Sequence, residues 1–377
     1  MSQDNHDESN HALDRRGFLG AAGATGTAVA LQISFGSSLA KAADWPGRPV
    51  TTVIMYSAGG GTDTVIRALT AEMAKAKGWT ITPINKPGAV GGVATRFVDN
   101  KQADGYTWLG AANYNKFVRV MGQSDSVAWM DWQYMQAANS LASWSVRTDS
   151  PYKTFNDVIA AAKANPGKIS ISTSGTGGLW HELAAIIADA AGVELKFVPY
   201  KGGKPATLAG LQGETDIAGG GVHEHVGLIR DGQLRCLQQT GTEDLDLGNG
   251  LVLPTVANFL PELKPRLPVG GVYNIAVKRD TPIEIINEIE DAFVAAVNSD
   301  SFKKIAEARF FDIDIRTGEA ADRRAALLET VTAATFEKHQ KAIGKEIKTA
   351  KELGLPTPEG FDAWWPPQGY KPLKGKA

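Results

Sequence analysis

The sequence predicts an α/β protein of two lobes, each a mostly parallel sheet flanked by helices. Two glycine-rich turns, at residues 56–63 and 172–178, carry this prediction. Each turn stands between an apolar stretch typical of a strand and apolar residues at helical spacing. The same order of strands and helices then follows both turns. Because ligands of such sheets bind beyond the carboxyl ends of the strands, we expect two βαβαβ units that face each other across a cleft.

The first unit alternates strands and helices in an order that its apolar periodicity defines. Its expected elements are a strand at 53–55, a helix with Ile66, Leu69 and Met73 on one face, a strand at 79–84, a short helix at 93–98 and a strand at 106–109. Glycine and proline near residues 87–92 and a turn at Asp104-Gly105 separate the later elements.

The second unit repeats this order with little sequence identity. Its expected elements are a strand at 169–171, a helix with Leu183, Ile186 and Ile187 on one face, a strand at 194–199, a short helix at 206–211 and a strand at 216–219. A glycine-rich link at 201–203 again precedes the short helix. Two turns of one design predict two walls of one binding cleft.

The segment from about residue 270 is expected to be structural. Thr281, Pro282 and Glu284 form a capping-box pattern with proline at the first helical position, and apolar residues follow at helical spacing up to Val297. The tail at 346–377 contains several prolines and aromatic residues. Proline blocks regular structure while aromatic rings need cover, so we expect an irregular strap along the first lobe.

The N-terminus indicates export. Arg15 and Arg16 resemble a twin-arginine motif, and an uncharged apolar stretch at 17–35 follows them. Small residues at 40 and 42 predict cleavage before Ala43, so residues 1–42 form the expected signal peptide and the mature protein is expected in the periplasm. Asp14 and Gly20 depart from the usual twin-arginine pattern, which leaves the export route open. A membrane anchor is the alternative.

Composition excludes several classes of function. The chain is 43% hydrophobic and 21% charged, with a formal net charge of −2 and no basic block, so nucleic acid is not an expected partner. Cys236 is the only cysteine, so an intramolecular disulfide is excluded. We expect Cys236 to be a buried small residue of a strand.

Two segments match the first residues of known enzyme motifs but lack the residues that the rest of each motif requires. His181 and Glu182 start a zinc-protease pattern, yet Ala185 stands where the second histidine belongs. Trp180 occupies the third glycine position of a dinucleotide fingerprint. His223 and His225 could be imagined as metal ligands, but a loop facing the cleft is favoured because no third ligand is evident. We therefore expect no catalytic residue, no metal and no cofactor.

Several motifs, in a fixed order, together resemble one family. They are AGGGTD at 58–63, NKPGA at 85–89, ADGYT at 103–107, DSPYKT at 149–154, ANPGK at 164–168, VPYKGG at 198–203 and PTV at 254–256. The chain resembles the extracytoplasmic solute receptors of tripartite tricarboxylate transporters, the TctC or Bug family, from Trp45 to about residue 345. The resemblance implies a type II-like periplasmic binding protein with residues 43–145 and 270–345 in lobe 1 and 146–269 in lobe 2.

The family resemblance also implies which residues bind the ligand. In such receptors the two glycine-rich loops hold carboxylates, largely through backbone N–H groups and water, as helix N-termini favour anions. The implied ligand-binding residues are Tyr56, Ser57, Ala58, Gly59, Gly60, Thr62, Asp63, Asn113, Ser174, Gly175, Thr176, Gly177, Gly178, Trp180, His181 and His223. Asp63 has an alternative role, which is to cap the helix that begins there.

Departures from the family pattern bear on specificity. Gly178 replaces a usual serine, Glu182 a usual leucine and Tyr56 a usual phenylalanine, while Trp180 adds an aromatic surface. These residues indicate a ligand with an aromatic or bulky apolar body. The alternative is that Trp180 packs into its own lobe.

The expected function is capture of a small carboxylate by a monomer whose lobes close and present a surface to membrane permease subunits. Two alternatives remain at this point. A sensor would use the same pocket to report to a membrane signalling protein. An exported enzyme would fit the twin-arginine route and the His223 and His225 pair.

Overall fold

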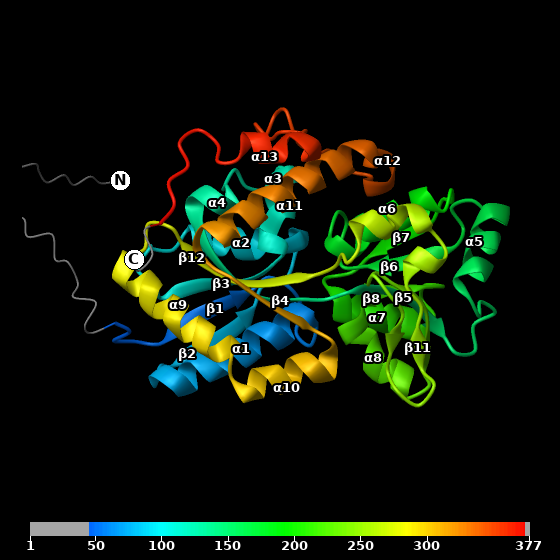
Figure 1. Ribbon diagram of the computed structural model, residues 1–377, viewed down its shortest axis with the longest axis horizontal. Coiled ribbons are helices and arrows are strands. Elements are labelled where there is room, and N and C mark those ends of the chain that lie inside the picture. The colour runs from blue at the N-terminus through cyan, green and yellow to red at the C-terminus, as the bar shows by residue number, and fades with distance from the viewer. Residues whose placement is uncertain (1–44, 374–377) are drawn as a thin grey trace, which may run out of the picture. The chain divides into compact units, whose positions relative to one another are not determined.

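The computed structural model describes residues 45–373, in which a six-stranded sheet with its helices forms one lobe and three smaller sheets with theirs form the other (Figure 1). Lobe 1 contains the six-stranded sheet, and lobe 2 contains strands β5 to β9. The expected signal peptide at 1–42 and its cleavage site lie outside the described residues. Within residues 45–373, no helix combines the length and the apolar character that crossing a bilayer requires.

The sheet of lobe 1 has the order β13-β4-β12-β3-β1-β2. Its strands are β1 (Val50–Ile54), β2 (Ile81–Asn85), β3 (Thr107–Ala112), β4 (Trp132–Asn139), β12 (Val272–Lys278) and β13 (Asp312–Arg316). β1 pairs in parallel with β2 and β3, as the predicted βαβαβ unit requires. β12 runs antiparallel to β3 and β4, so the sheet is mixed where the returning chain joins it.

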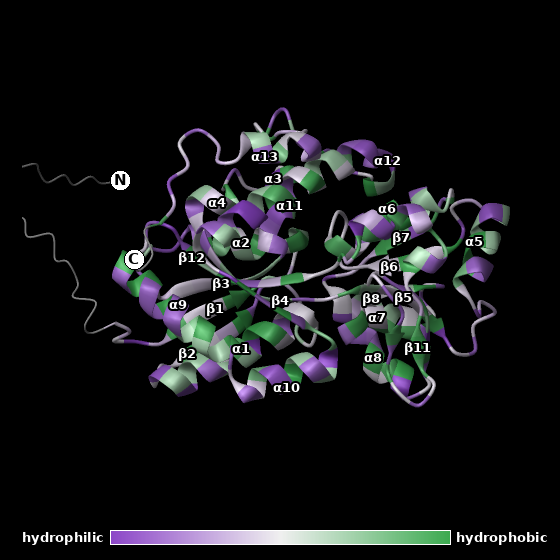
Figure 2. Cartoon of the chain, in the orientation of Figure 1, coloured by the Kyte–Doolittle hydropathy of each residue, from purple (hydrophilic) through white to green (hydrophobic). Residues whose placement is uncertain are grey.

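Helices cover both faces of this sheet. The helices of lobe 1 are α1 (Gly61–Lys77), α2 (Gly92–Asp99), α3 (Lys116–Val120), α4 (Ala128–Asp131), α9 (Ile283–Val297), α10 (Asp300–Arg309), α11 (Gly318–Lys338) and α12 (Gln340–Ile343), which packs on α6 of lobe 2; short 3₁₀ turns are η2 (Ala89–Gly91) and η3 (Asn113–Asn115). α1, α9 and α10 pack on one face, and α3, α4 and α11 pack on the other (Figure 1). The longer helices α1, α9 and α10 carry hydrophobic and hydrophilic residues on different sides, as amphipathic helices do (Figure 2).

The N-terminus of α9 differs from the prediction made from the sequence. The capping box expected at Thr281 and Glu284 is not formed in the described chain: α9 begins at Ile283, after Pro282, without a side-chain cap. The carbonyl of Pro282 instead accepts from the N–H groups of Ile285 and Ile286.

Lobe 2 repeats the architecture at smaller size. Its strands are β5 (Ala142–Arg147), β6 (Ser170–Thr173), β7 (Lys196–Pro199), β8 (Ala218–Gly221) and β9 (Leu234–Gln239), with the short hairpin β10 (Leu245–Asp246) and β11 (Val252–Leu253). Its helices are α5 (Phe155–Ala164), α6 (Leu179–Ala190), α7 (Gly203–Gln212) and α8 (Val222–Arg230), with 3₁₀ turns η4 (Val256–Asn258) and η5 (Pro261–Arg266). A parallel bridge between Ile171 and Ile217 joins the β6-β7 pair to β8.

The chain passes between the lobes twice, and the two crossings touch. The first lies between β4 and β5, so the boundary expected at residues 145 and 146 falls inside β5. The second leads from β9 to β12. The backbone N–H of Ser140 donates to the carbonyl of Gly271 at 2.7 Å, and a side-chain carbon on Gly270 would lie 1.8 Å from the Ser140 carbonyl oxygen. The two connecting segments are therefore in direct contact between the lobes.

The tail lies on lobe 1 and contains the turn η6 (Pro358–Gly360) and the short helix α13 (Phe361–Trp364), drawn in red in Figure 1. Leu353, Leu355 and Phe361 are buried in the core of lobe 1. Polar contacts fix the same segment, since Arg119 Nη2 donates to the Leu353 carbonyl at 2.7 Å and Tyr370 Oη to Asp322 at 2.9 Å.

Candidate functional site

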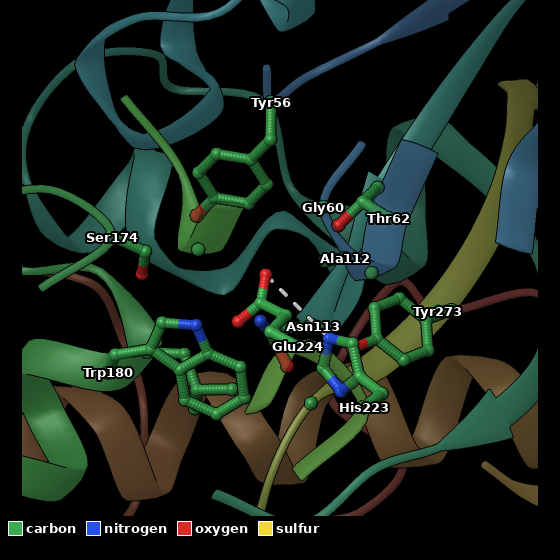
Figure 3. Close-up of a pocket in the computed structure, with 14 residues that line it drawn as sticks. Tyr56, Gly60, Thr62, Ala112, Asn113, Ser174, Trp180, His223, Glu224 and Tyr273 are labelled. Atoms are coloured by element: carbon green, nitrogen blue, oxygen red, sulfur yellow. Dashed lines mark hydrogen bonds and ion pairs between the residues drawn. The ribbon is translucent and has the colours of Figure 1, made fainter. Parts of the chain in front are cut away.

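A small pocket lies between the lobes, beyond the carboxyl ends of β1, β3, β6 and β8 (Figure 3). Lobe 1 contributes Tyr56, Gly60, Gly61, Thr62, Ala112, Asn113, Gly271 and Tyr273. Lobe 2 contributes Ser174, Leu179, Trp180, Gly203, His223 and Glu224. Ligands of open α/β sheets bind at this end of the strands, so the pocket is the candidate binding site.

Three helices begin at this pocket without a side-chain cap. α1, α6 and α7 follow Gly60, Gly178 and Gly202, and no side chain of the described residues caps them. In contrast, α5, which begins away from the pocket, has a complete capping box at Thr154. The first N–H groups of a helix have no partner inside the helix, and the helix dipole adds partial positive charge there. The three N-termini together can bind an anion.

Two glycines of the pocket permit close approaches, Gly61 between the lobes and Gly203 between α7 and α8 within lobe 2. A side-chain carbon on Gly61 would lie 2.2 Å from His223 Nε2 and 2.5 Å from Tyr273 Oη. One on Gly203 would lie 1.9 Å from Glu224 Oε1. Any larger residue would displace these side chains. Neither glycine was among the expected site residues, although both lie in the glycine-rich segments that the sequence analysis identified.

The first glycine-rich loop contributes some of its expected residues and uses others for internal structure. Tyr56, Gly60 and Thr62 line the pocket, as does Asn113 at the end of β3. Ser57, Ala58, Gly59 and Asp63 lie outside its lining.

Two of these outlying residues have clear structural roles. Ser57 reaches lobe 2, where its N–H and hydroxyl donate to the Lys201 carbonyl at 3.3 and 2.8 Å. Asp63 holds the loop, because its carboxylate accepts from Gly59 N at 2.9 Å, Arg67 Nε at 2.8 Å and Asn85 Nδ2 at 2.8 Å.

The second loop divides in the same way. Ser174 lines the pocket, whereas Gly175 and Thr176 line a neighbouring cavity that shares Tyr56 and Ser174. Gly178 precedes α6. A side-chain carbon on Gly177 would lie 2.8 Å from the sulfur of Met121, so this glycine packs against lobe 1.

His181 points away from the pocket. Its Nδ1 accepts from Gly177 N at 3.0 Å, and its Nε2 lies 3.1 Å from the Ala342 carbonyl near the end of α12. Burial lowers its pKa to about 4, so the ring is neutral and joins the lobes structurally. The first turn of α6 had suggested a ligand contact because the sequence does not show which side of the turn the ring takes.

Trp180 lines the pocket and also packs across the lobe interface. Its side chain is buried among residues of the lobe 1 core, and its indole faces Glu224 and Tyr56 in Figure 3. Its ring centroid lies 6.3 Å from that of His223. Trp180 therefore lines the pocket as expected and packs against the core of lobe 1, whereas the alternative had it packed into its own lobe.

A polar cluster forms the base of the pocket. His223 Nε2 lies 3.3 Å from Tyr273 Oη and 3.7 Å from Glu224 Oε1, while Tyr273 Oη also contacts Ser140 Oγ at 3.0 Å. Burial raises the pKa of Glu224, but the charge and hydrogen bonding of His223 and the Gly221 N–H outweigh burial, so its pKa is lowered. Glu224 is therefore ionised at neutral pH. Glu224 and Tyr273 were absent from the expected site.

His223 and His225 occupy a helix rather than the expected loop. Both lie in α8, and His225 turns away from the pocket to Ser143 Oγ and Ser145 Oγ at 2.7 and 3.0 Å. Burial lowers the pKa of His225 to about 4. Residues 45–373 contain no group of three or more histidine, cysteine, aspartate or glutamate side chains arranged to hold a metal.

Two α/β lobes joined by two crossings, with a pocket where their strands end, are the fold of periplasmic binding proteins such as BugD, which matches with a TM-score of 0.66 and 22% identity. The chain belongs to the tripartite tricarboxylate transporter family of receptors, whose model matches residues 65–338. This membership confirms the resemblance seen in the motifs. The family consists of solute receptors and not of enzymes.

Individual relatives agree with this assignment. The UPF0065 protein in the gbd 5′ region of Cupriavidus necator is 28% identical over 296 residues, which cover 78% of this chain and 88% of that protein. An R. palustris protein solved with adipate has a TM-score of 0.67 and 24% identity, covering 81% of this chain and 100% of its own. MatC of Rhodopseudomonas palustris, solved with malate, has a TM-score of 0.66 and 21% identity, covering 79% and 100%. The two structures establish the likeness of fold.

Proposed function

We propose that this protein is a periplasmic receptor that captures a small carboxylate between its lobes and delivers it to the permease subunits of a tripartite tricarboxylate-type transporter. The observation that carries the proposal is the meeting of three uncapped helix N-termini, those of α1, α6 and α7, in one buried pocket. Uncharged N–H donors fixed at helix ends bind a carboxylate without a buried lysine or arginine.

The relatives support the choice of ligand class. The proteins solved with adipate and malate share the fold, and both of those ligands are carboxylates. Trp180 and Tyr56 offer two aromatic faces in the same pocket, which supports an aromatic or bulky apolar body on the ligand of this chain.

Closure of the lobes is the proposed binding step. Contacts already connect the lobes around the pocket, since Tyr273 of lobe 1 meets His223 of lobe 2 and Ser57 meets Lys201. A ligand that touches both glycine-rich loops interacts more strongly with the closed form than with the open form, so it shifts the population toward closure. The two touching crossings at Ser140 and Gly271 provide the hinge.

The proposal also covers export, oligomeric state and the bounds of the lobes. The signal peptide at 1–42 directs export by an Arg15-Arg16 motif, and the mature protein starts at Ala43 and acts as a monomer in the periplasm. Lobe 1 comprises residues 43–145 and 270–345, apart from the first residues of β5, and carries the tail at 346–377. Lobe 2 comprises the intervening residues.

A thermal-shift screen of the purified protein, followed by calorimetry, tests the proposal. The panel contains aliphatic di- and tricarboxylates, amino acids and aromatic acids. A Gly61→Val variant removes space at the α1 N-terminus, while Gly227→Ala on α8 is the matched control, because a side-chain carbon at Gly227 meets no described atom within 4 Å. We expect specific stabilisation by at least one carboxylate in wild type and control and none in Gly61→Val. Stabilisation by no carboxylate would overturn the proposed function.

A further inference from the structure

Glu224 places a carboxylate inside the pocket. Its side chain is only 3% exposed, and in Figure 3 it lies between Tyr56, Trp180 and His223. Oε2 accepts a hydrogen bond from Gly221 N at 3.0 Å. Oε1 has His223 as an ion-pair partner, with Nε2 3.7 Å away. A carboxylate oxygen has two lone pairs, so Oε1 can accept a hydrogen bond from a ligand in addition to this contact.

A second polar group of the pocket also lacks a partner. The hydroxyl of Tyr56 is buried and makes no hydrogen bond to any residue that the structure describes. In Figure 3 it points into the pocket, on the same side as the hydroxyl of Ser174. Buried polar atoms are nearly always hydrogen-bonded, so an orphaned hydroxyl in a binding pocket indicates a polar ligand group at that position.

These groups share one chemistry. Glu224 Oε1, Tyr56 Oη and Ser174 Oγ can all accept hydrogen bonds, and Trp180 presents an indole ring, the aromatic surface that cations prefer. A second ligand carboxylate near Glu224 would instead meet a like charge in a site poor in water, where repulsion is strongest. The pocket thus offers the N–H groups of helix N-termini to an anion and the Glu224 carboxylate, which lies beside Gly60 and Gly203 at the starts of α1 and α7, to a cation.

From this division, and resting on the proposed function, we infer that the ligand carries a positively charged nitrogen in addition to its carboxylate, and that Glu224 binds this nitrogen. The carboxylate docks at the N-termini of α1 and α6. The nitrogen lies between Glu224, Tyr56 and the face of Trp180. The ligand class is a zwitterion, such as an amino acid or an aminoalkyl-substituted aromatic acid. The protein binds its negative and its positive group at separate positions of the pocket.

Matched ligand pairs test this inference by calorimetry with the purified protein. Each pair exchanges an ammonium group for a hydroxyl or carboxylate: aspartate against malate, 6-aminohexanoate against adipate, and 4-(aminomethyl)benzoate against terephthalate. In at least one pair we expect the ammonium member to bind about tenfold or more tightly. Glu224→Gln keeps the shape of the side chain but removes its charge. This variant should lower the affinity for the ammonium member about tenfold. Its affinity for the member without the ammonium group should be unchanged or higher.

Two further variants provide a charge control and a second test of the nitrogen site. Glu262→Gln, on the exposed surface of η5, is the control for loss of one negative charge and should change neither affinity. Tyr56→Phe removes only the hydroxyl that lacks a hydrogen-bond partner, and it provides a second test of the inference if Glu224→Gln does not fold. It should weaken the ammonium member about threefold more than its dicarboxylate partner.

The possible results separate the inference from the proposed function. Tight binding of dicarboxylates with no preference for ammonium members would overturn the inference and leave the proposed function standing. Equal tightening of both members of each pair in Glu224→Gln would mean that Glu224 itself fills the carboxylate seat, which also overturns the inference. Binding of no carboxylate of either kind would overturn both.

Discussion

Lys116 Nζ on α3 lies 2.8 Å from Glu182 Oε2 on α6, and the pair joins the two lobes through a buried contact, with side chains 6% and 3% exposed. Thr332 Oγ1 on α11 donates to the other oxygen of Glu182 at 2.6 Å. The family resemblance indicates leucine at the position of Glu182, so this chain has a charge pair where an apolar contact is usual. A buried charge that loses its partner is costly, whereas replacement of both charges by apolar residues is often neutral.

Glu182→Leu alone should therefore destabilise the closed arrangement by about 3–5 kcal/mol, because it leaves Lys116 buried without a counter-charge. The double variant Lys116→Met with Glu182→Leu should recover most of this loss. Urea unfolding of the wild type, both single variants and the double variant gives the coupling energy. The exposed pair Lys341 and Glu194 is the control, and its removal should leave the free energy of unfolding nearly unchanged because solvent screens it. Additive effects at Lys116 and Glu182 would contradict the prediction.

Gly61→Ala should weaken ligand binding much more than it changes folding. The added methyl group would collide with His223 of lobe 2, which approaches Gly61 where the lobes meet, and with Tyr273 Oη of lobe 1. Because the collision with His223 arises only on closure, alanine should hinder closure more than the folding of either lobe. We expect the affinity for the tightest carboxylate of the panel to fall about tenfold or more, measured by calorimetry. Gly227→Ala should bind as the wild type does, and equal affinity in both variants would show that closure does not require this glycine.

Acidification should destabilise the protein through His225. Burial lowers its pKa to about 4 from an ordinary value of 6.5, so the folded state binds fewer protons than the unfolded state between these values. The stability associated with the neutral His225 ring is fully present above pH 6.5 and is lost as the pH falls from 6.5 toward 4. Over this window the wild type should lose on the order of 3 kcal/mol more than His225→Gln, which cannot titrate. Denaturant unfolding at several pH values measures the difference, and parallel curves for both proteins would contradict the prediction.

The sequence predicted local features well and tertiary contacts poorly. Both glycine-rich turns follow strands and open helices, because apolar spacing and glycine are local signals. Gly203, Glu224 and Tyr273 were missed because they come from separate segments that meet only in the folded chain. His181 and Asp63 were expected near the ligand, yet each contributes hydrogen bonds within its own loop, since which way a first-turn side chain points depends on its tertiary partners.

Removal of residues 351–377 should lower the melting temperature, because this tail supplies part of the core of lobe 1. Leu353, Leu355 and Phe361 are buried there, and Phe361 lies against Trp364 and Trp365 with ring centroids 5.8 and 6.1 Å away. Phe361→Ala alone should cost about 3–5 kcal/mol in the free energy of unfolding, since it empties a buried site. Calorimetric melting of the truncated and point variants measures both effects, and removal of only residues 374–377 is the control. An unchanged melting temperature without residues 351–377 would show that the tail adds contacts but no stability.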